Sequence, residues 1–212
     1  MRFLITAFGL LLLTLSAPAA VIYSGVQNVA IPFNFDGVFV NLLTKATATT
    51  EPGTWTSGAW INPIFGGTQF ASNEIVRPSV IAGTAGSEQM INFTLGAEID
   101  ATDFYAASYN GSTTHTGPTL SQFIVGMEGY FGIKLSQGAN THYGWARMTV
   151  NDSGSGTLHD WAYNATAGEG LYAGTQLAVP EPSRAVLLAA GLLGLVMRRR
   201  RPSLGTCHQS VG

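Results

Sequence analysis

The sequence predicts an all-β protein, with one β-sandwich domain of jelly-roll-like topology between an N-terminal signal peptide and a short C-terminal transmembrane helix. Three observations lead to this expectation. Short apolar segments in the body alternate with polar residues and are separated by turns rich in Gly, Ser and Asn. No stretch of the body keeps a 3.6-residue apolar period over four turns. Continuous apolar runs occur only near the two ends of the chain, each beside basic residues.

The expected strands follow one another along the body. Residues 31–35 alternate before an Asp36-Gly37 turn, and residues 38–43 follow, which together predict a β-hairpin. Turns are expected at residues 83–87 and 151–156, where small and polar residues cluster. Further strands are expected at residues 75–82, 89–95, 123–135, 142–150 and 157–163.

Residues 1–19 have the organisation of a secretory signal peptide. Arg2 provides a short basic region, residues 3–15 are apolar, and Ala17-Pro18-Ala19 supplies small residues at the expected cleavage site. The apolar run is shorter than the roughly 20 residues that span a bilayer, which favours a cleaved signal over an anchor. Residues 20–178 are then the exported domain.

Residues 179–201 combine three features of a stop-transfer segment, which halts a chain during its transfer across a membrane. Pro180-Glu181-Pro182 keeps the chain extended, because proline disfavours helix in itself and in the residue before it. An apolar run at 185–197 would form a helix of about 20 Å, short for a hydrocarbon core of about 30 Å. A basic cluster then holds the end on the cytoplasmic side under the positive-inside rule, with residues 202–212 as a cytoplasmic tail. The cluster consists of Arg198, Arg199, Arg200 and Arg201.

These C-terminal features together resemble the PEP-CTERM sorting signal of Gram-negative bacteria, the tag carried by exosortase substrates. The resemblance implies transit across the inner membrane, transient anchoring through the C-terminal helix, recognition and removal of the tail by an exosortase, and release to the cell surface or exopolysaccharide matrix. In that scheme the chain is a substrate, and the catalytic residues belong to the exosortase. The tail at 202–212 departs from the pattern, since such signals usually end soon after the arginines.

The body also resembles a recurring group of PEP-CTERM proteins without an assigned activity. This second resemblance implies a secreted, surface-directed β domain and names no ligand. The sequence segments that carry this resemblance are residues 23–25, 31–40, 61–63, 129–134, 141–150 and 159–163.

The charge and the cysteine content of the body exclude several classes of function. Of the 212 residues only 10% are charged, and residues 20–179 hold four basic against eleven acidic side chains, a net charge of −7. Such a body repels phosphate backbones, which excludes nucleic-acid binding. The single cysteine, Cys207, follows the arginine cluster, so the body contains no disulfide, thiolate ligand or cysteine nucleophile.

One stretch of the body is a candidate glycan-binding platform. On a strand, Tyr143, Trp145 and Arg147 would share one face, where aromatic rings could stack on a sugar and the guanidinium could bind its hydroxyls or carboxylates. The alternative is an internal aromatic layer in which Arg147 forms an ion pair, with Asp160 as the candidate partner.

Metal binding and hydrolysis have weaker support. Carboxylates could bind calcium at Glu98, Asp100 and Asp103, or at Asp152. The histidines lack the spacing of a zinc site, so no metal or cofactor is expected. A glycan hydrolase needs two carboxylates, and the candidates are Glu128 and Asp103. Neither lies in a recognisable catalytic sequence motif. The dispersed histidines are His115, His142 and His159.

The sequence therefore predicts a non-enzymatic, exported surface or matrix protein processed by an exosortase. Two alternatives remain: a lectin-like carbohydrate-binding module with exopolysaccharide as its partner, and a secreted glycan hydrolase. These alternatives differ in whether the body has an open binding face or a catalytic pair of carboxylates.

Overall fold

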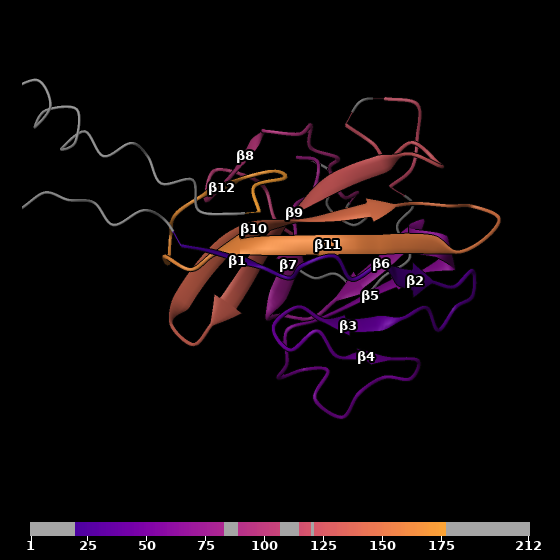
Figure 1. The fold of residues 1–212 in the computed structure, drawn as a ribbon, viewed down its shortest axis with the longest axis horizontal. Helices are drawn as coiled ribbons and strands as arrows, with labels where there is room; N and C mark the ends of the chain where they lie inside the picture. The colour runs from indigo at the N-terminus through magenta and orange to yellow at the C-terminus, as the bar shows by residue number, and fades with distance from the viewer. Residues whose placement is uncertain (1–19, 83–88, 107–114, 120, 177–212) are drawn as a thin grey trace, which may run out of the picture. The chain divides into compact units, whose positions relative to one another are not determined.

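The computed structural model describes residues 20–82, 89–106, 115–119 and 121–176, and these form an all-β structure (Figure 1). They lie within one compact unit, Ala19–Ala178. The all-β class predicted from the sequence is confirmed. The described strands are β1 (Val21–Tyr23), β2 (Val29–Ile31), β3 (Phe39–Asn41), β4 (Thr47–Ala48), β5 (Trp60–Ile64), β6 (Gln69–Ser72), β7 (Val76–Pro78), β8 (Glu98–Ile99), β9 (Glu128–Gln137), β10 (Asn140–Thr149), β11 (Gly156–Asn164) and β12 (Leu171–Tyr172), with one 3-10 turn, η1 (Phe65–Gly67).

A six-stranded antiparallel sheet, the large sheet, is the framework of the unit. Its order is β1-β11-β10-β9-β7, and β2 also pairs with β11. The three long strands β9, β10 and β11 form a meander whose side chains alternate between the two faces of the sheet. One face carries Phe131, Ile133, Ala146 and Trp161, which are all buried in the main core.

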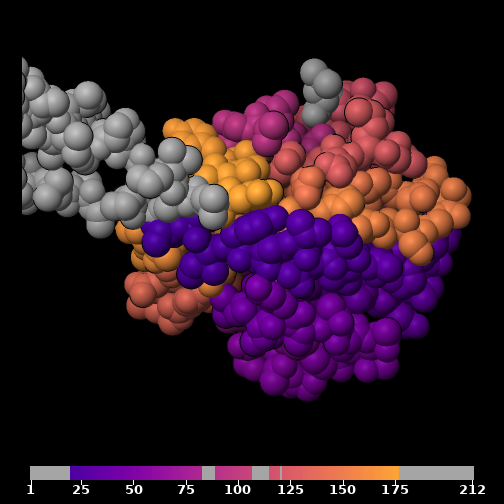
Figure 2. All heavy atoms as spheres, viewed as in Figure 1, coloured from indigo at the N-terminus to yellow at the C-terminus, as the bar shows by residue number. Residues whose placement is uncertain are grey.

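The second sheet has the order β4-β3-β5-β6 and contributes to the same core. Its buried residues Val40, Ile61 and Phe70 belong to the same apolar cluster as the inward face of the large sheet. Phe70 and Phe131 meet edge to face with ring centroids 5.2 Å apart. In Figure 2 the N-terminal half of the unit, in indigo and purple, covers one side, and the later strands cover the other. Shared apolar burial therefore holds the two sheets together.

A second, smaller core covers part of the outward face of the large sheet. The two-stranded sheet β12-β8 lies over β10 and β11, where Ile99 and Leu171 are buried with Trp145 and Ala162. Half-buried Tyr130 packs against this cluster. The large sheet consequently has apolar contacts on both faces over part of its length.

The predicted hairpin between residues 31–35 and 38–43 is wrong. β2 pairs with β11 in the large sheet, whereas β3 pairs with β4 and β5 in the second sheet. The chain between them crosses from one sheet to the other, and Gly37 lies in the crossing with φ +60°. A Cβ atom at Gly37 would lie 2.3 Å from the carbonyl oxygen of Pro63, so only glycine fits this close approach.

Other expected strands agree to different degrees with the structure. Three of them correspond to β9, β10 and β11, and residues 75–82 contain the short β7. Residues 89–95 do not form a strand and have only the isolated bridges of Met90 to Val80 and Phe93 to Tyr130. Strands β5 and β6 were not predicted, because Pro63 and the glycines of η1 interrupt their apolar pattern.

The predicted signal peptide (1–19), sorting signal (179–201) and cytoplasmic tail (202–212) lie outside the described residues. Within the part of the chain that is described, no helix has the length and apolar character needed to cross a membrane.

Candidate functional site

The candidate platform residues Tyr143, Trp145 and Arg147 do share the outward face of β10. In the antiparallel register, Trp145 lies between Gly132 and Ala162, and Arg147 lies between Tyr130 and Asp160. The intervening residues of β10 face the main core instead.

Burial rules out an open aromatic platform at this position. Tyr143 is 8% exposed and Trp145 is 0% exposed. The Trp145 indole packs against Tyr23 and Tyr130, and its Nε1 donates a hydrogen bond to the carbonyl oxygen of Thr175 at 3.1 Å. Tyr143 packs against the ring of Tyr105. A sugar cannot stack on rings that protein atoms already cover, so the expectation of a platform here is corrected in favour of the internal aromatic layer.

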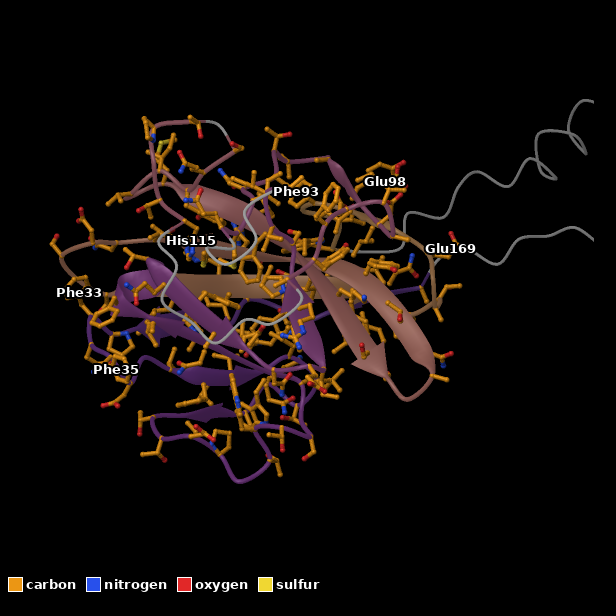
Figure 3. All side chains as sticks on the ribbon, turned by 180° about the vertical axis from the view of Figure 1, so that it is seen from behind. Phe33, Phe35, Phe93, Glu98, His115 and Glu169 are labelled. Carbon is orange, nitrogen blue, oxygen red and sulfur yellow. The ribbon has the colours of Figure 1, made fainter. Side chains whose placement is uncertain are left out.

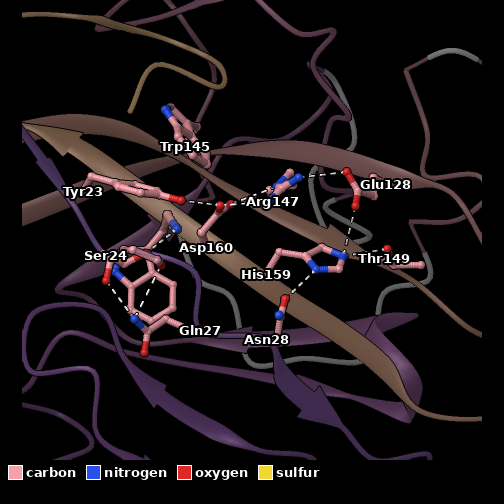
Figure 4. Close-up of polar contacts among 12 residues, drawn as sticks. Tyr23, Ser24, Gln27, Asn28, Glu128, Trp145, Arg147, Thr149, His159 and Asp160 are labelled. Carbon is pink, nitrogen blue, oxygen red and sulfur yellow. Dashed lines mark hydrogen bonds and ion pairs between the residues drawn. The ribbon is translucent and has the colours of Figure 1, made fainter. Parts of the chain in front are cut away.

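Arg147 is held by two carboxylates (Figure 4). Its Nε and Nη2 donate to the two oxygens of Asp160 at 2.9 Å each, and its Nη1 donates to Glu128 at 3.0 Å. Asp160 is completely buried and accepts a third hydrogen bond from the Tyr23 hydroxyl at 2.7 Å. The two-point geometry between a guanidinium and a carboxylate is among the strongest pairings in proteins. We call Tyr23, Glu128, Arg147 and Asp160 the arginine network.

A histidine extends this network toward β2. His159 lies on β11 where the register with β10 shifts, so that Met148 pairs with Leu158. Its Nδ1 lies 3.1 Å from the side-chain oxygen of Asn28, which only accepts hydrogen bonds, and the proton is therefore assigned to Nδ1. Its Nε2 then accepts from the Thr149 hydroxyl at 2.8 Å, with Glu128 3.7 Å away.

Burial and the neighbouring carboxylates shift the pKa values of side chains in and beside the arginine network. Burial and the hydrogen bond to Asp160 raise the pKa of Tyr23 to about 12. The hydrogen bonds to Asp160 raise the pKa of Arg147 further above its already high value, although burial acts in the opposite direction. Burial also raises the pKa of Tyr130. At neutral pH, Tyr23 is therefore a neutral donor and Arg147 a cation.

The raised pKa of Tyr23 predicts a loss of stability in alkaline solution. An unfolded tyrosine ionises near pH 10, whereas Tyr23 in the folded protein ionises near 12, so the contribution of Tyr23 is fully present below pH 10 and declines as the pH rises toward 12. Urea unfolding between pH 7 and 12 should show the stability difference between wild type and Tyr23→Phe shrinking above pH 10.

The matched control is Tyr172→Phe, which removes a tyrosine that is 53% exposed and lies outside the network. A stability difference between wild type and Tyr23→Phe that stays constant from pH 8 to 12 would show that Tyr23 ionises as it does in the unfolded chain. Absorbance at 295 nm follows the ionised tyrosines in the same samples.

The other candidate residues have local roles. Asp100 caps the following turn by accepting from the backbone and hydroxyl of Thr102, and these bonds lower the pKa of its carboxyl. Asp103 accepts from the backbone nitrogen of Asp100, and burial raises its pKa. His142 bonds the carbonyl oxygen of Asn164 through Nδ1. Nowhere in the described ranges do three or more His, Cys, Asp or Glu side chains gather as a group that could hold a metal ion.

Sequence reasoning identified part of the arginine network and missed the rest. The pairing of Arg147 with Asp160 was the predicted alternative, and Glu128 was singled out only as a hydrolase candidate. Tyr23 and Asn28 were missed, because they lie more than a hundred residues from their partners along the chain. Nothing in the local pattern indicates that β1 and β2 both pair with β11.

The arrangement binds the N-terminal strands to the large sheet. Tyr23 belongs to β1, Asn28 precedes β2, and both are held by side chains of β11. No family model, no curated protein and no solved structure matches this chain. The contacts of the arginine network and of His159 hold β1 and the residue before β2 against β11.

Proposed function

We propose that this chain is an exported, non-enzymatic protein of the cell surface or extracellular polysaccharide matrix, and that an exosortase processes its C-terminal signal. The observation that carries the proposal is the pair of terminal sequences. A signal peptide precedes the body, and Pro180-Glu181-Pro182, an apolar segment and Arg198 to Arg201 follow it.

The body has properties suited to export. Its core contains large aromatic and aliphatic side chains from both sheets, and residues 20–179 contain no cysteine that an oxidising compartment could alter. We take this body to be a β-sandwich with a jelly-roll-like topology, formed by the large sheet and the β4-β3-β5-β6 sheet. Apolar burial alone is sufficient to stabilise a domain of this size without disulfides.

The proposal predicts removal of the C-terminal arginines from the released protein. In a Gram-negative host with an active exosortase, intact-mass spectrometry of the released form should show a C-terminus that lacks Arg198 to Arg201. Deletion of the exosortase should leave the full tail on a membrane-bound form. Retention of the arginines in the released form would contradict the proposal.

Two glutamate variants test whether removal of the tail depends on the Pro180-Glu181-Pro182 motif. Glu181→Ala alters the Pro-Glu-Pro sequence, and we expect the tail to be retained and the protein to accumulate in the membrane fraction. Glu169→Ala removes an exposed glutamate of the body and should be processed like the wild type. Equal processing of both variants would show that the motif is not what the peptidase reads.

A further inference from the structure

An exposed aromatic loop lies at one end of the unit. Phe33 is 50% exposed and Phe35 is 76% exposed, in the segment that crosses from β2 to β3. Both rings meet Phe65 edge to face, with centroid distances of 5.9 and 6.2 Å and interplanar angles of 66° and 67°. None of the three rings is therefore covered by a parallel ring within this cluster. We call Phe33, Phe35 and Phe65 the phenylalanine cluster.

The loop is held in place by backbone hydrogen bonds. Phe65 donates to the carbonyl oxygen of Asn34 and Gly66 donates to that of Pro32, both at 3.0 Å. The Asn34 side chain accepts from the backbone nitrogen of Gly37 at 2.8 Å. Phe65 itself has φ +48°, an unfavourable conformation for a residue with a side chain. A fixed loop loses little conformational freedom on binding, which favours a binding role over a passive apolar surface.

The cluster lies at the opposite end of the unit from the ends of the described chain. Ile31 pairs with Gly156 at the start of β11, whereas Val21 pairs with Asn164 at its end, about 26 Å away at 3.3 Å per residue. Figure 3 shows Phe33 and Phe35 at one end of the unit and Glu169 at the other. The cluster is therefore far from the first strand of the described chain and from Glu169.

The electrostatic surroundings of the cluster are acidic. Asp36 lies in the loop, and the backbone of Asn151 donates to Gly66, which places the turn containing exposed Asp152 beside it. The described chain has four basic residues. The backbone nitrogen of Lys45 donates to the carbonyl oxygen of Asn41, and Asn41 pairs with Trp60 at the far end of β5 from Phe65.

Of the other three basic residues, two lie toward the other end of the large sheet and the third is already paired with carboxylates. Arg77 pairs with Lys134 on β7 and β9, next to the end of β10 that begins at Asn140. Arg147 is occupied by the arginine network. No lysine or arginine among the described residues therefore offers an unpaired charge at this end of the unit, which disfavours polyuronates, phosphates and anionic lipid surfaces as ligands.

We propose that the phenylalanine cluster binds a neutral polysaccharide. The rings supply apolar faces for the C–H surfaces of sugar rings, and exposed Asn34 and Asp36 place an amide and a carboxylate in the same loop for hydroxyl groups. This inference deepens the proposed function, because it names the class of matrix component that an exported protein of this kind would contact.

The test is affinity electrophoresis of the full-length chain, purified in mild detergent, through gels containing dextran, hydroxyethyl cellulose, galactomannan or alginate. We expect retardation by at least one of the three neutral polymers and none by alginate. The double variant F33S/F35S should bind at least tenfold more weakly at an unchanged melting temperature. Phe104→Ser, which removes a phenylalanine that is 63% exposed in another segment, should bind like the wild type.

A second variant checks the role of the ring itself. Phe35→Trp keeps an aromatic face, so it should retain binding and report it by a change in tryptophan fluorescence. Migration of the folded wild type unaltered in all three neutral gels, or equal retardation of F33S/F35S, would overturn the proposal. Cluster-dependent binding to phosphatidylethanolamine and phosphatidylglycerol vesicles, or cluster-dependent dimerisation, would overturn it in favour of a lipid surface or a second copy. None of these assays depends on exosortase processing, so the two proposals fail separately.

Discussion

Replacing Asp160 by alanine should lower the free energy of unfolding by about 3–5 kcal/mol, the range found when one partner of a buried ion pair is removed. Asp160 is 0% exposed and accepts three hydrogen bonds, two from Arg147 and one from Tyr23. Its removal leaves a half-buried guanidinium with only exposed Glu128 to pair with and leaves the Tyr23 hydroxyl without its acceptor. Urea unfolding at pH 7 measures the change.

The matched control uses the other carboxylate on the same guanidinium. Glu128 is 53% exposed, so Glu128→Gln should cost less than about 1 kcal/mol, as exposed ion pairs do. A double-mutant cycle with Arg147→Met isolates the coupling to each carboxylate. If the Asp160 and Glu128 variants lose similar free energies of unfolding, the buried ion pair contributes no more stability than the exposed one, and the prediction is wrong.

Trp145→Ala should be the second strongly destabilising change, by about 3–5 kcal/mol, as expected when a buried aromatic side chain is truncated and a cavity is left. The indole is 0% exposed and packs between Tyr23 and Tyr130. The carbonyl oxygen of Thr175 also loses its indole donor. Thermal and urea unfolding measure the stability, and amide exchange over residues 171–175 should accelerate because this segment is held against the sheet partly by that hydrogen bond.

Two further variants grade the loss of packing. Trp145→Phe keeps a ring between the two tyrosines but removes the N–H donor and part of the buried ring volume, so it should destabilise the protein less than Trp145→Ala does. Trp55→Ala truncates a half-buried tryptophan next to Phe39 and should cost less than Trp145→Ala. Unchanged stability of Trp145→Ala, with loss of polysaccharide binding, would return Trp145 to the role of a sugar-stacking residue.

The long strands were predictable because their local pattern agrees with their environment. In β10, His142, Tyr143, Trp145 and Met148 are all buried, yet alternate residues still divide between the main core and the outward aromatic layer. The segments at residues 142–150 and 157–163, both expected to be strands, correspond to the paired strands β10 and β11. The internal ion pair of Arg147 was among the expected alternatives, and in the structure Arg147 and Asp160 face each other in register on adjacent strands.

The partners of short strands were not predictable. A three-residue strand such as β2 carries too few side chains to indicate which sheet it joins, and its register with β11 depends on residues 125 to 129 positions further along the chain. The same limitation hid the phenylalanine cluster. The alternation in residues 31–35 predicted a strand, whereas Phe33 and Phe35 are exposed beside Phe65 from another part of the chain.

The sequence by itself determined the all-β class, the long strands and the net negative charge of the body, and the export proposal is drawn from its two terminal segments. These properties reside in local periodicity and composition, which no distant contact changes. Only the tertiary structure decided that Trp145 is a core residue, that Asp160 is buried with Arg147, and that Phe33 and Phe35 remain exposed. Burial is the physical reason for the difference, because an aromatic side chain has the same local pattern whether the chain folds over it or leaves it open to solvent.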